Sequence, residues 1–262
     1  MRLCLLASGS SGNCAYLEAG GTRILIDAGI SLRQVRLRLA RIGVSEATID
    51  GLLISHEHSD HVGQASRVAL HFDCPIYASE RTALKFRRRL CGWEKQEQFQ
   101  PETRFAIGAL EIEPFRIPHD ACEPCGFLIQ GPSQLAGPTV SAAIATDLGL
   151  VSPKLRRRLA SCEALIIEAN HDTQMLLEGP YPQYLKQRIQ SELGHLSNDS
   201  AAELIAQLAR EGRLRQVLLA HLSRNNNRPE VALETVRRHL DGQGDCRLHL
   251  SYRDRPSELL VL

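Results

Sequence analysis

Short runs of apolar or alternating residues recur along the whole chain, and helical patterns or turns rich in Gly, Pro and Asn separate them. Runs of this kind are typical of strands, whereas apolar positions three and four residues apart are typical of helices that pack on a core. The pattern predicts strands over 2–7, 14–18, 22–27, 51–55, 75–78, 109–117, 125–130, 140–146, 164–168, 216–220 and 246–252. It predicts helices near 31–42, 62–71, 80–91, 152–160, 182–192, 198–211 and 229–240.

The order of these elements differs between the two halves of the chain. Hairpin-like pairs of strands dominate the first half, and strands alternate with helices in the second, which predicts a mixed α/β fold. No repeat of fixed period, low-complexity tract or long linker interrupts the pattern. We therefore expect residues 1–262 to form a single domain.

Composition and charge exclude several classes of protein. A chain of 262 residues with 43% hydrophobic side chains can bury a sizeable core, which excludes a disordered protein. The net charge of +1 provides no global field that would indicate a nucleic-acid coat or a membrane-surface protein, so a polyanion would be bound locally. Apolar runs are too short for a signal peptide or a membrane span. We expect a cytoplasmic protein without membrane contact, whose eight cysteines are mostly reduced thiols.

Four metal-binding side chains fall within six residues, directly after the predicted strand that ends at Ser55. The segment reads His56-Glu57-His58-Ser59-Asp60-His61, an HxHxDH pattern. Side chains two residues apart on an extended chain point to the same side, which brings His56 and His58 together, and a turn would let Asp60 and His61 reach a second point. This arrangement favours a site for two metal ions about 3.5–4 Å apart. The alternative is an exposed polar turn that happens to contain histidines.

Three further candidate ligands follow predicted strands elsewhere: His119, Asp147 and His221. Taken singly, a strand-end Asp is often a helix cap and a strand-end His is often structural. Together with the HxHxDH segment they indicate a site that a rigid sheet assembles from distant loops.

On these residues the chain resembles the metallo-β-lactamase fold superfamily, an αββα sandwich of two mixed sheets flanked by helices. The resemblance implies that one ion is held by His56, His58 and His119, that the other is held by Asp60, His61 and His221, and that Asp147 bridges them. It also implies that Asp27, after Arg23-Ile-Leu-Ile, orients the HxHxDH loop through hydrogen bonds without being a ligand.

Two divalent ions imply hydrolysis, because they activate a water molecule and neutralise charge on substrate oxygens. Nitrogen and oxygen ligands suit zinc and also manganese or iron, so the sequence leaves the metal open. Asp60 and Asp147 are expected to take part in catalysis as ligands.

A candidate phosphate site lies near Gly194-His195-Leu196-Ser197-Asn198, just before a helical pattern. Ser197 or Asn198 can cap a helix whose free amides attract an anion, and His195 could protonate a departing oxygen. The alternative is an ordinary capped helix with a structural histidine. Lys186 and Arg188 could line the same cleft or simply be solvated. Further basic clusters, at Lys85 with Arg87–Arg89 and at Lys154 with Arg156–Arg158, could bind a phosphate backbone or serve solubility.

The chain most resembles the YycJ/WalJ-like group within this superfamily. The motifs that carry this resemblance are Ser8–Asn13, Leu53–His61, Glu168–Asp172, Gly179–Lys186, Gly194–Asn198 and His221-Leu-Ser. The resemblance implies a metal-dependent phosphodiesterase or nuclease, with 5′ to 3′ exonuclease action on duplex DNA, and a link to cell-wall regulation. His171 could contact substrate, support a ligand or pack in the core.

Two alternatives remain open at this point. One is a small-molecule hydrolase of the same fold, which would cleave a phosphodiester or a thioester. The other is a non-catalytic interaction or redox module that uses the CxxC pair Cys122 and Cys125, where the group's pattern has small or apolar residues. The sequence favours a merely structural loop over a redox or zinc-binding role for this pair, because a second CxxC is missing. Protein partners cannot be predicted from the sequence.

Overall fold

The computed structural model describes residues 1–44, 48–134, 139–240, 242 and 246–262. The chain divides into two compact units that alternate along the sequence. Unit 1 comprises Met1–Arg116, Ala121–Val140 and Tyr252–Leu262, and unit 2 comprises Ile117–Asp120 and Ser141–Ser251. The expectation of a single domain over residues 1–262 stays a prediction.

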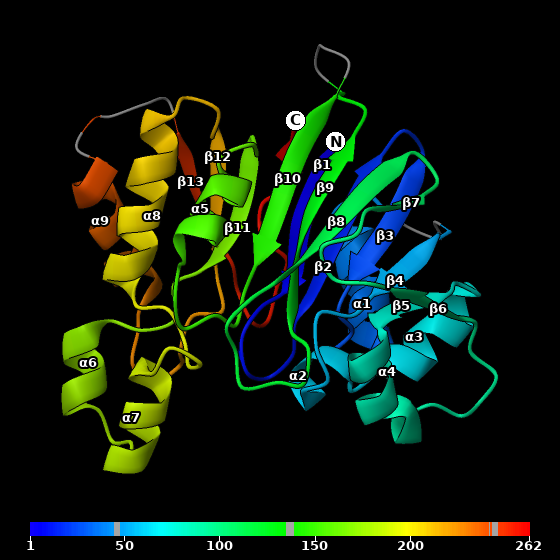
Figure 1. Cartoon of the computed structure of the whole chain (residues 1–262), viewed down its shortest axis with the longest axis horizontal. Helices are drawn as coiled ribbons and strands as arrows, with labels where there is room; N and C mark the ends of the chain where they lie inside the picture. Colours follow the sequence, from blue (N-terminus) through cyan, green and yellow to red (C-terminus); the bar gives the residue numbers. More distant parts are fainter. Residues whose placement is uncertain (45–47, 135–138, 241, 243–245) are drawn as a thin grey trace. The chain divides into compact units, whose positions relative to one another are not determined.

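Unit 1 contains a mixed sheet of seven strands in the order β14-β1-β2-β3-β4-β5-β6. Its strands are β1 (Arg2–Ala7), β2 (Cys14–Ala19), β3 (Thr22–Ile26), β4 (Gly51–Leu53), β5 (Ile76–Ser79), β6 (Gln96–Phe99) and β14 (Leu260–Val261). The pairs from β14 to β3 are antiparallel, and those from β3 to β6 are parallel. The pairing of β1 with β14 places the two termini side by side (Figure 1).

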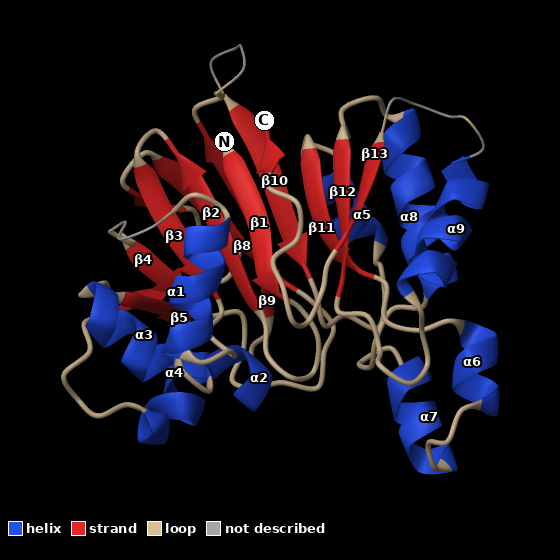
Figure 2. Ribbon diagram, turned by 180° about the vertical axis from the view of Figure 1, so that it is seen from behind, coloured by secondary structure: helices blue, strands red, loops and turns tan. Residues whose placement is uncertain are grey.

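Helices of unit 1 cover this sheet, and apolar side chains between them form a core. The helices are α1 (Leu32–Arg41), the single turn α2 (Ser59–Val62), α3 (Ala65–Phe72) and α4 (Glu80–Phe86). Figure 2 shows α1 lying across one face of the sheet. Val35 and Leu39 of α1, Val68 of α3 and Leu52 of β4 belong to one buried cluster. Unit 1 also contains an antiparallel ladder of β7 (Phe105–Ile107), β8 (Leu110–Arg116) and β9 (Cys125–Gly131).

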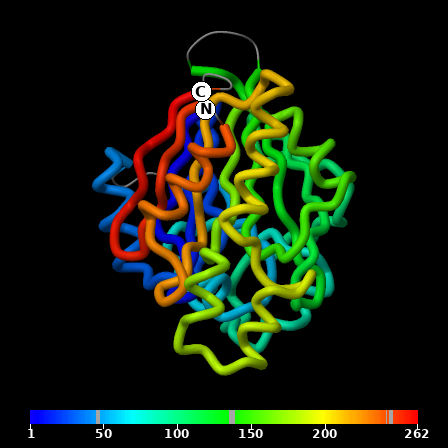
Figure 3. Tube along the Cα trace, turned by 90° about the vertical axis from the view of Figure 1, so that its left-hand side faces the viewer, coloured from blue at the N-terminus to red at the C-terminus, as the bar shows by residue number. Residues whose placement is uncertain are grey.

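Unit 2 is built on the parallel strands β10 (Val140–Ala145), β11 (Ala164–Glu168), β12 (Gln216–Ala220) and β13 (Arg247–Leu250). Its helices are α5 (Pro153–Leu159), α6 (Thr173–Glu178), α7 (Gln183–Gln190), α8 (Asn198–Arg210) and α9 (Pro229–Leu240). Figures 1 and 3 show α8 beside α9, with α6 and α7 near the end from which α8 starts. Because the strands are parallel, their carboxyl ends lie at one edge of the unit.

The predicted elements are confirmed apart from their ends, and some short elements were missed. Strands β6, β7 and β14 and helices α2 and α6 had no prediction, because they are short and lack a clear apolar period. The strand predicted over 51–55 ends at Leu53, where the chain turns toward the HxHxDH segment, and the helix predicted over 80–91 ends at Phe86 before a 3-10 turn, Arg87–Arg89. None of the helices described is both long and apolar enough to cross a lipid bilayer.

Candidate metal and active site

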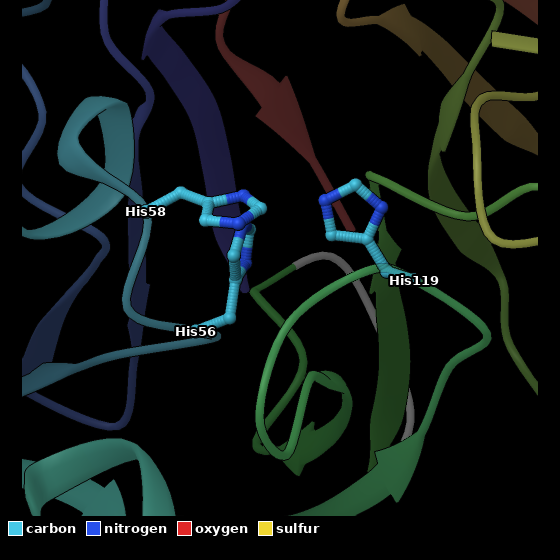
Figure 4. A group of neighbouring side chains, drawn as sticks. All are labelled: His56, His58 and His119. Atoms are coloured by element: carbon cyan, nitrogen blue, oxygen red, sulfur yellow. The ribbon is translucent and has the colours of Figure 1, made fainter. Parts of the chain in front are cut away.

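The HxHxDH segment forms a compact cluster of imidazoles at the carboxyl end of β4 in unit 1. His56 and His61 are buried, and His58 and Asp60 are partly exposed. The ring centroid of His56 lies 4.7 Å from that of His58 and 4.0 Å from that of His61. Figure 4 shows the rings of His56 and His58 drawn together above the loop that carries them. Three imidazoles of one short segment therefore converge.

Asp27 supports this cluster from the end of β3. Its Oδ2 lies 2.7 Å from Nδ1 of His61, and its carboxylate also accepts hydrogen bonds from the backbone N and the hydroxyl of Ser55 at 2.8 to 3.0 Å. The backbone of Asp27 has a φ of 62°, in the left-handed region that costs a non-glycine residue about 1 kcal/mol or more. The carboxylate engages Nδ1 of His61, and a metal ligand oriented in this way would bind through Nε2.

Two residues that the sequence analysis missed hold the backbone of the same loop. Asn13 donates its backbone N–H to the carbonyl of Asp60 at 2.8 Å, and its Nδ2 lies 3.2 Å from Oδ2 of Asp60 and 3.0 Å from Nε2 of His61. Gly29 packs so closely that a Cβ atom there would lie 1.7 Å from the carbonyl oxygen of Asp60. The Ser8–Asn13 loop thus positions the HxHxDH segment through Asn13.

Unit 2 carries its candidate residues at the carboxyl ends of its strands and in the adjoining loops. Asp147 follows β10, His221 follows β12, and both are buried with left-handed φ values of 59° and 53°. His119, labelled in Figure 4, lies in the loop after β8. It is buried, and its ring centroid lies 5.5 Å from that of His195. His195 precedes α8 and stays partly exposed, with 24% of its side chain accessible.

Glu168, the last residue of β11, connects the histidines of unit 2. Its side chain is fully buried, and Oε1 lies 2.8 Å from Nδ1 of His195 and 2.8 Å from Nδ1 of His221. Nε2 of His221 in turn lies 3.4 Å from Oδ1 of Asp147. One carboxylate therefore orients two imidazoles, a role for Glu168 that no sequence pattern had indicated.

Burial and charge shift the pKa values of these groups in different directions. Burial opposes ionisation of Glu168, but the charges and hydrogen bonds of His195 and His221 outweigh it and lower its pKa. Burial also works against the charged form of His195, yet the neighbouring Glu168 carboxylate raises the pKa of His195 overall. Burial lowers the pKa of His119, and the charge of Asp147 only partly opposes this effect.

The residues predicted to contact substrate are engaged within the protein. Ser197 caps α8 by accepting a hydrogen bond from Ser200 N, and Asn198 is fully buried with its amide bonded to Asn227. Lys186 donates to the carbonyl of Leu177 at 2.6 Å, and Arg188 forms an ion pair with Asp120. These contacts give the residues structural roles, and their substrate contacts stay predictions.

His171 is buried at the start of the loop before α6, at 3% exposure. Its Nδ1 finds no hydrogen-bond partner among the described residues. Burial lowers the pKa of His171 to about 4, which the charge of Glu168 only partly opposes. Burial is compatible with packing in the core, and a contact of His171 with substrate stays a prediction.

Cys122 and Cys125 belong to a loop that is tied to the HxHxDH segment. The backbone N–H of Cys122 donates to Oε1 of Glu57 at 2.8 Å, and that of Cys125 donates to the carbonyl of Ser55 at 3.0 Å. All eight cysteines of the chain are free thiols, as predicted. These contacts give the loop a structural role.

Both clusters have the chemistry that a divalent metal requires. In unit 2, single ligand atoms of Asp147, Glu168, His195 and His221 lie within 4.8 Å of one another. In each unit a buried carboxylate holds Nδ1 of a histidine, Asp27 for His61 and Glu168 for His221. Carboxylate support of this kind is typical of histidines that bind metals through the other nitrogen. The donor set therefore fits zinc, manganese or iron.

Comparison with known proteins places the chain in a family. A family model described as a beta-lactamase superfamily domain matches residues 22–222. The chain is 35% identical over 236 residues to "Exodeoxyribonuclease WalJ" of Streptococcus pneumoniae serotype 2, a match that covers 88% of this chain and 85% of that protein. It is 32% identical over 247 residues to "Exodeoxyribonuclease YycJ" of Bacillus anthracis, with 93% and 90% covered. The chain therefore belongs to the β-lactamase superfamily and, within it, to the group that includes WalJ and YycJ.

Solved structures confirm the predicted fold class. Zn(2+)-bound PqqB from Methylobacterium extorquens matches with a TM-score of 0.71 at 16% identity, over 100% of both chains. The metallo-beta-lactamase fold protein YhfI from Bacillus subtilis matches with a TM-score of 0.70 at 16% identity, over 97% of this chain and 98% of that one. At this level of identity the likeness concerns the fold alone.

Proposed function

We propose that this protein is a metal-dependent exodeoxyribonuclease that hydrolyses phosphodiester bonds of DNA. The observation that carries the proposal is the carboxylate-supported histidine cluster in each unit, Asp27 with His61 and Glu168 with His221. The substrate class rests on the relatives in Streptococcus pneumoniae and Bacillus anthracis, both named exodeoxyribonucleases.

The proposed ligands are those that the resemblance implies. His56, His58 and His119 would hold one ion, Asp60, His61 and His221 would hold the other, and Asp147 would bridge them. The buried state of His56, His61, Asp147 and His221 supports this assignment, because burial around a metal site limits the access of solvent to the ions. Two divalent ions would lower the pKa of a water molecule and neutralise charge on the phosphate oxygens.

His195 is proposed to protonate the departing oxygen. Glu168 fixes its ring through Nδ1, which directs Nε2 away from the carboxylate, and the side chain remains partly exposed to reach a substrate. The same carboxylate favours the protonated ring. Asp27 and Asn13 position the HxHxDH loop, and neither needs to touch the substrate.

Action on duplex DNA from the 5′ end is the finer part of the proposal. Its test uses duplexes labelled at the 5′ or the 3′ end and protein loaded with manganese or zinc. Early release of the 5′ label, with slow shortening of the 3′-labelled strand, would support this polarity. Equal release of both labels or internal cuts would contradict it.

The chemistry itself is tested with Asp147→Asn, which is expected to lose DNA shortening and part of its bound metal. Asp199→Asn makes the same charge change at an exposed position at the start of α8 and should keep full activity. If Asp147→Asn shortens DNA normally, the proposed site is wrong. Cleavage of bis-p-nitrophenyl phosphate without any shortening of DNA would favour a small-molecule hydrolase.

His195→Ala is expected to lower turnover by about 100-fold or more, because a positioned acid is lost. The metal content, measured by elemental analysis, should stay unchanged. A loss of metal in this variant would make His195 a ligand instead.

A further inference from the structure

One exposed stretch of unit 1 is strongly basic although the chain as a whole is nearly neutral. Residues 81–93, here called the basic segment, contain five basic and no acidic side chains, whereas the whole chain has a net charge of +1. The segment runs through most of α4, the 3-10 turn Arg87–Arg89 and the loop that follows. Its cations are Arg81, Lys85, Arg87, Arg88 and Arg89.

The basic side chains of this segment point to solvent and are not neutralised. All five are exposed, and none forms an ion pair within the described part of the chain. The Arg116 and Arg188 side chains, by contrast, are paired with Glu123 and Asp120. Leu84, Lys85, Arg87 and Arg88 line a surface depression of about 490 Å³. Positive charge is thus concentrated on one surface without compensation.

Trp93 is presented on the same segment. It is the chain's single tryptophan, and 84% of it is exposed, which is unusual for so large an apolar side chain. The buried carboxylate of Glu94 accepts hydrogen bonds from the backbone N–H groups of Cys91 and Gly92, both at 2.9 Å, and from the hydroxyl of Ser66. These contacts hold the loop in place, so the indole is held outward by the fold.

The basic segment is linked to the HxHxDH loop by contacts within unit 1. Strands β4 and β5 are parallel neighbours, so α4 leaves the sheet at the same edge as His56. The loop from Cys122 to Cys125 joins the two regions, because Cys122 N–H donates to Glu57 and the Glu123 carbonyl accepts from the hydroxyl of Thr82 at 3.3 Å. A strand bound by the segment would therefore run beside the candidate metal ligands of this unit.

We propose that the basic segment binds a single strand of nucleic acid, with phosphates on its arginines and lysine and an unpaired base stacked on Trp93. Phosphates account for the uncompensated charge, and a base offers the flat apolar face that an exposed indole can cover. A base inside a duplex has no free face, so the ligand is an unpaired stretch. The inference rests on the proposed nuclease function and assigns part of its substrate binding.

Because Trp93 is the only tryptophan, its fluorescence reports on the proposed site directly. Metal-loaded protein is titrated with a short phosphorothioate oligothymidylate, which resists cleavage. We expect the fluorescence to be quenched, with an affinity that falls as salt is raised. No quenching at low salt would overturn the inference.

Variants separate the two parts of the proposed contact, with binding measured by the anisotropy of a labelled oligothymidylate. Trp93→Ala is expected to weaken binding by about 10-fold, the loss typical of one stacked base. Replacing Arg87, Arg88 and Arg89 together by Gln is expected to lower the slope of log K against log salt by about 2. The matched control replaces Arg156, Arg157 and Arg158 on α5 by Gln and should leave the slope unchanged.

Failure of this inference can be told apart from failure of the proposed function. If DNA is shortened normally but Trp93 fluorescence is not quenched and the two triple variants bind with equal affinity, the basic segment does not bind the strand. The proposed nuclease function would still stand. If Trp93 fluorescence is quenched but DNA is not shortened, the proposed nuclease function is wrong. The basic segment would then remain a binding surface for nucleic acid. The denaturation midpoint should be the same in wild type and Trp93→Ala, so that the loss of binding reports on the stacked base; if the midpoint falls, the quenching titration of the wild-type protein still decides the inference.

Discussion

The histidine clusters of the two units are supported by carboxylates in different ways. In unit 1, Asp27 serves a single imidazole, His61, and shares its oxygens with Ser55. In unit 2, one oxygen of Glu168 serves both His195 and His221. Glu168 is fully buried, whereas Asp27 lies beside a loop that is partly exposed.

This difference predicts that the two clusters will respond unequally to the loss of their carboxylate. In unit 1 the Ser55 hydroxyl lies 3.2 Å from Nδ1 of His61 and could still orient it. In unit 2 the Asn170 amide nitrogen lies 3.3 Å from Nδ1 of His221, and the carboxylate of Glu168 is the shared acceptor for both rings. Loss of the carboxylate should therefore disturb the imidazoles of unit 2 more than those of unit 1.

Among the substitutions that test this difference between the two carboxylates, Glu168→Gln is expected to have the largest effect. The amide keeps the shape of the side chain but removes the charge that orients His195 and His221, so DNA shortening should fall by about 100-fold. The specific activity with end-labelled DNA and the metal content of the purified variant are the measurements. Activity within a few-fold of wild type would show that the two rings do not depend on this carboxylate.

Asp27→Asn is expected to cost less, about 10-fold in activity, because one imidazole loses its charged partner and Ser55 can still bond the remaining carbonyl oxygen. Asparagine also tolerates the left-handed backbone at this position. The same assay and metal analysis apply. A loss of activity equal to or larger than that of Glu168→Gln would contradict the expected difference between the two clusters.

His171 is a third case: a buried imidazole of unit 2 that has no hydrogen-bonded carboxylate among the described residues. Its pKa is lowered to about 4 in the folded protein by burial, against an unfolded value of about 6.5. The unfolded chain therefore binds the extra proton first, and stability falls as the pH drops from about 6.5 toward 4, by about 2 kcal/mol at pH 5.

Denaturant unfolding at pH 7.5 and pH 5 measures this effect for wild type and for His171→Gln. The variant should lose that part of the pH dependence, whereas His71→Gln, at an exposed position on α3, should retain it. If the free energy of unfolding of His171→Gln falls between pH 7.5 and pH 5 as much as that of wild type, another group causes the pH dependence.

The smallest expected effect concerns the left-handed backbone of Asp27. Glycine adopts a φ of 62° freely and alanine does not, so Asp27→Gly should be more stable than Asp27→Ala by about 1 kcal/mol. Denaturation midpoints give this difference. At Asp50, which has no positive φ, the order should be reversed, with the alanine variant more stable than the glycine variant. The same order at both positions would argue against backbone strain at Asp27.

The sequence predicted the fold class and the central elements well, because long apolar periods survive in any tertiary context. Strands β1, β11 and β12 and helix α9 have the predicted bounds, and the HxHxDH segment could be recognised because its four ligand-type residues are contiguous. Short polar elements such as β6 were missed, because an exposed edge strand needs no apolar alternation.

Of the two carboxylates that orient candidate ligand histidines, only one was predicted from the sequence. Asp27 was expected to orient the HxHxDH loop through a resemblance, and it does bond His61. Glu168 was overlooked because an acidic residue that ends an apolar strand looks like an ordinary boundary. Ser197 and Asn198 suggested an anion site, which stays a prediction; in the fold Ser197 caps α8 and Asn198 bonds Asn227.

The amino-acid pattern was enough to show which chemistry is available: imidazoles and carboxylates placed at strand ends, a mixed α/β fold, and a basic run from residue 81 to residue 93. Which groups meet depends on the fold. Glu94 bonds the loop that carries the exposed Trp93. Glu168 meets His221 because the parallel strands β11 and β12 end at one edge, and it meets His195 because the loop before α8 returns to that edge. Such contacts join residues far apart along the chain, and local patterns carry no record of them.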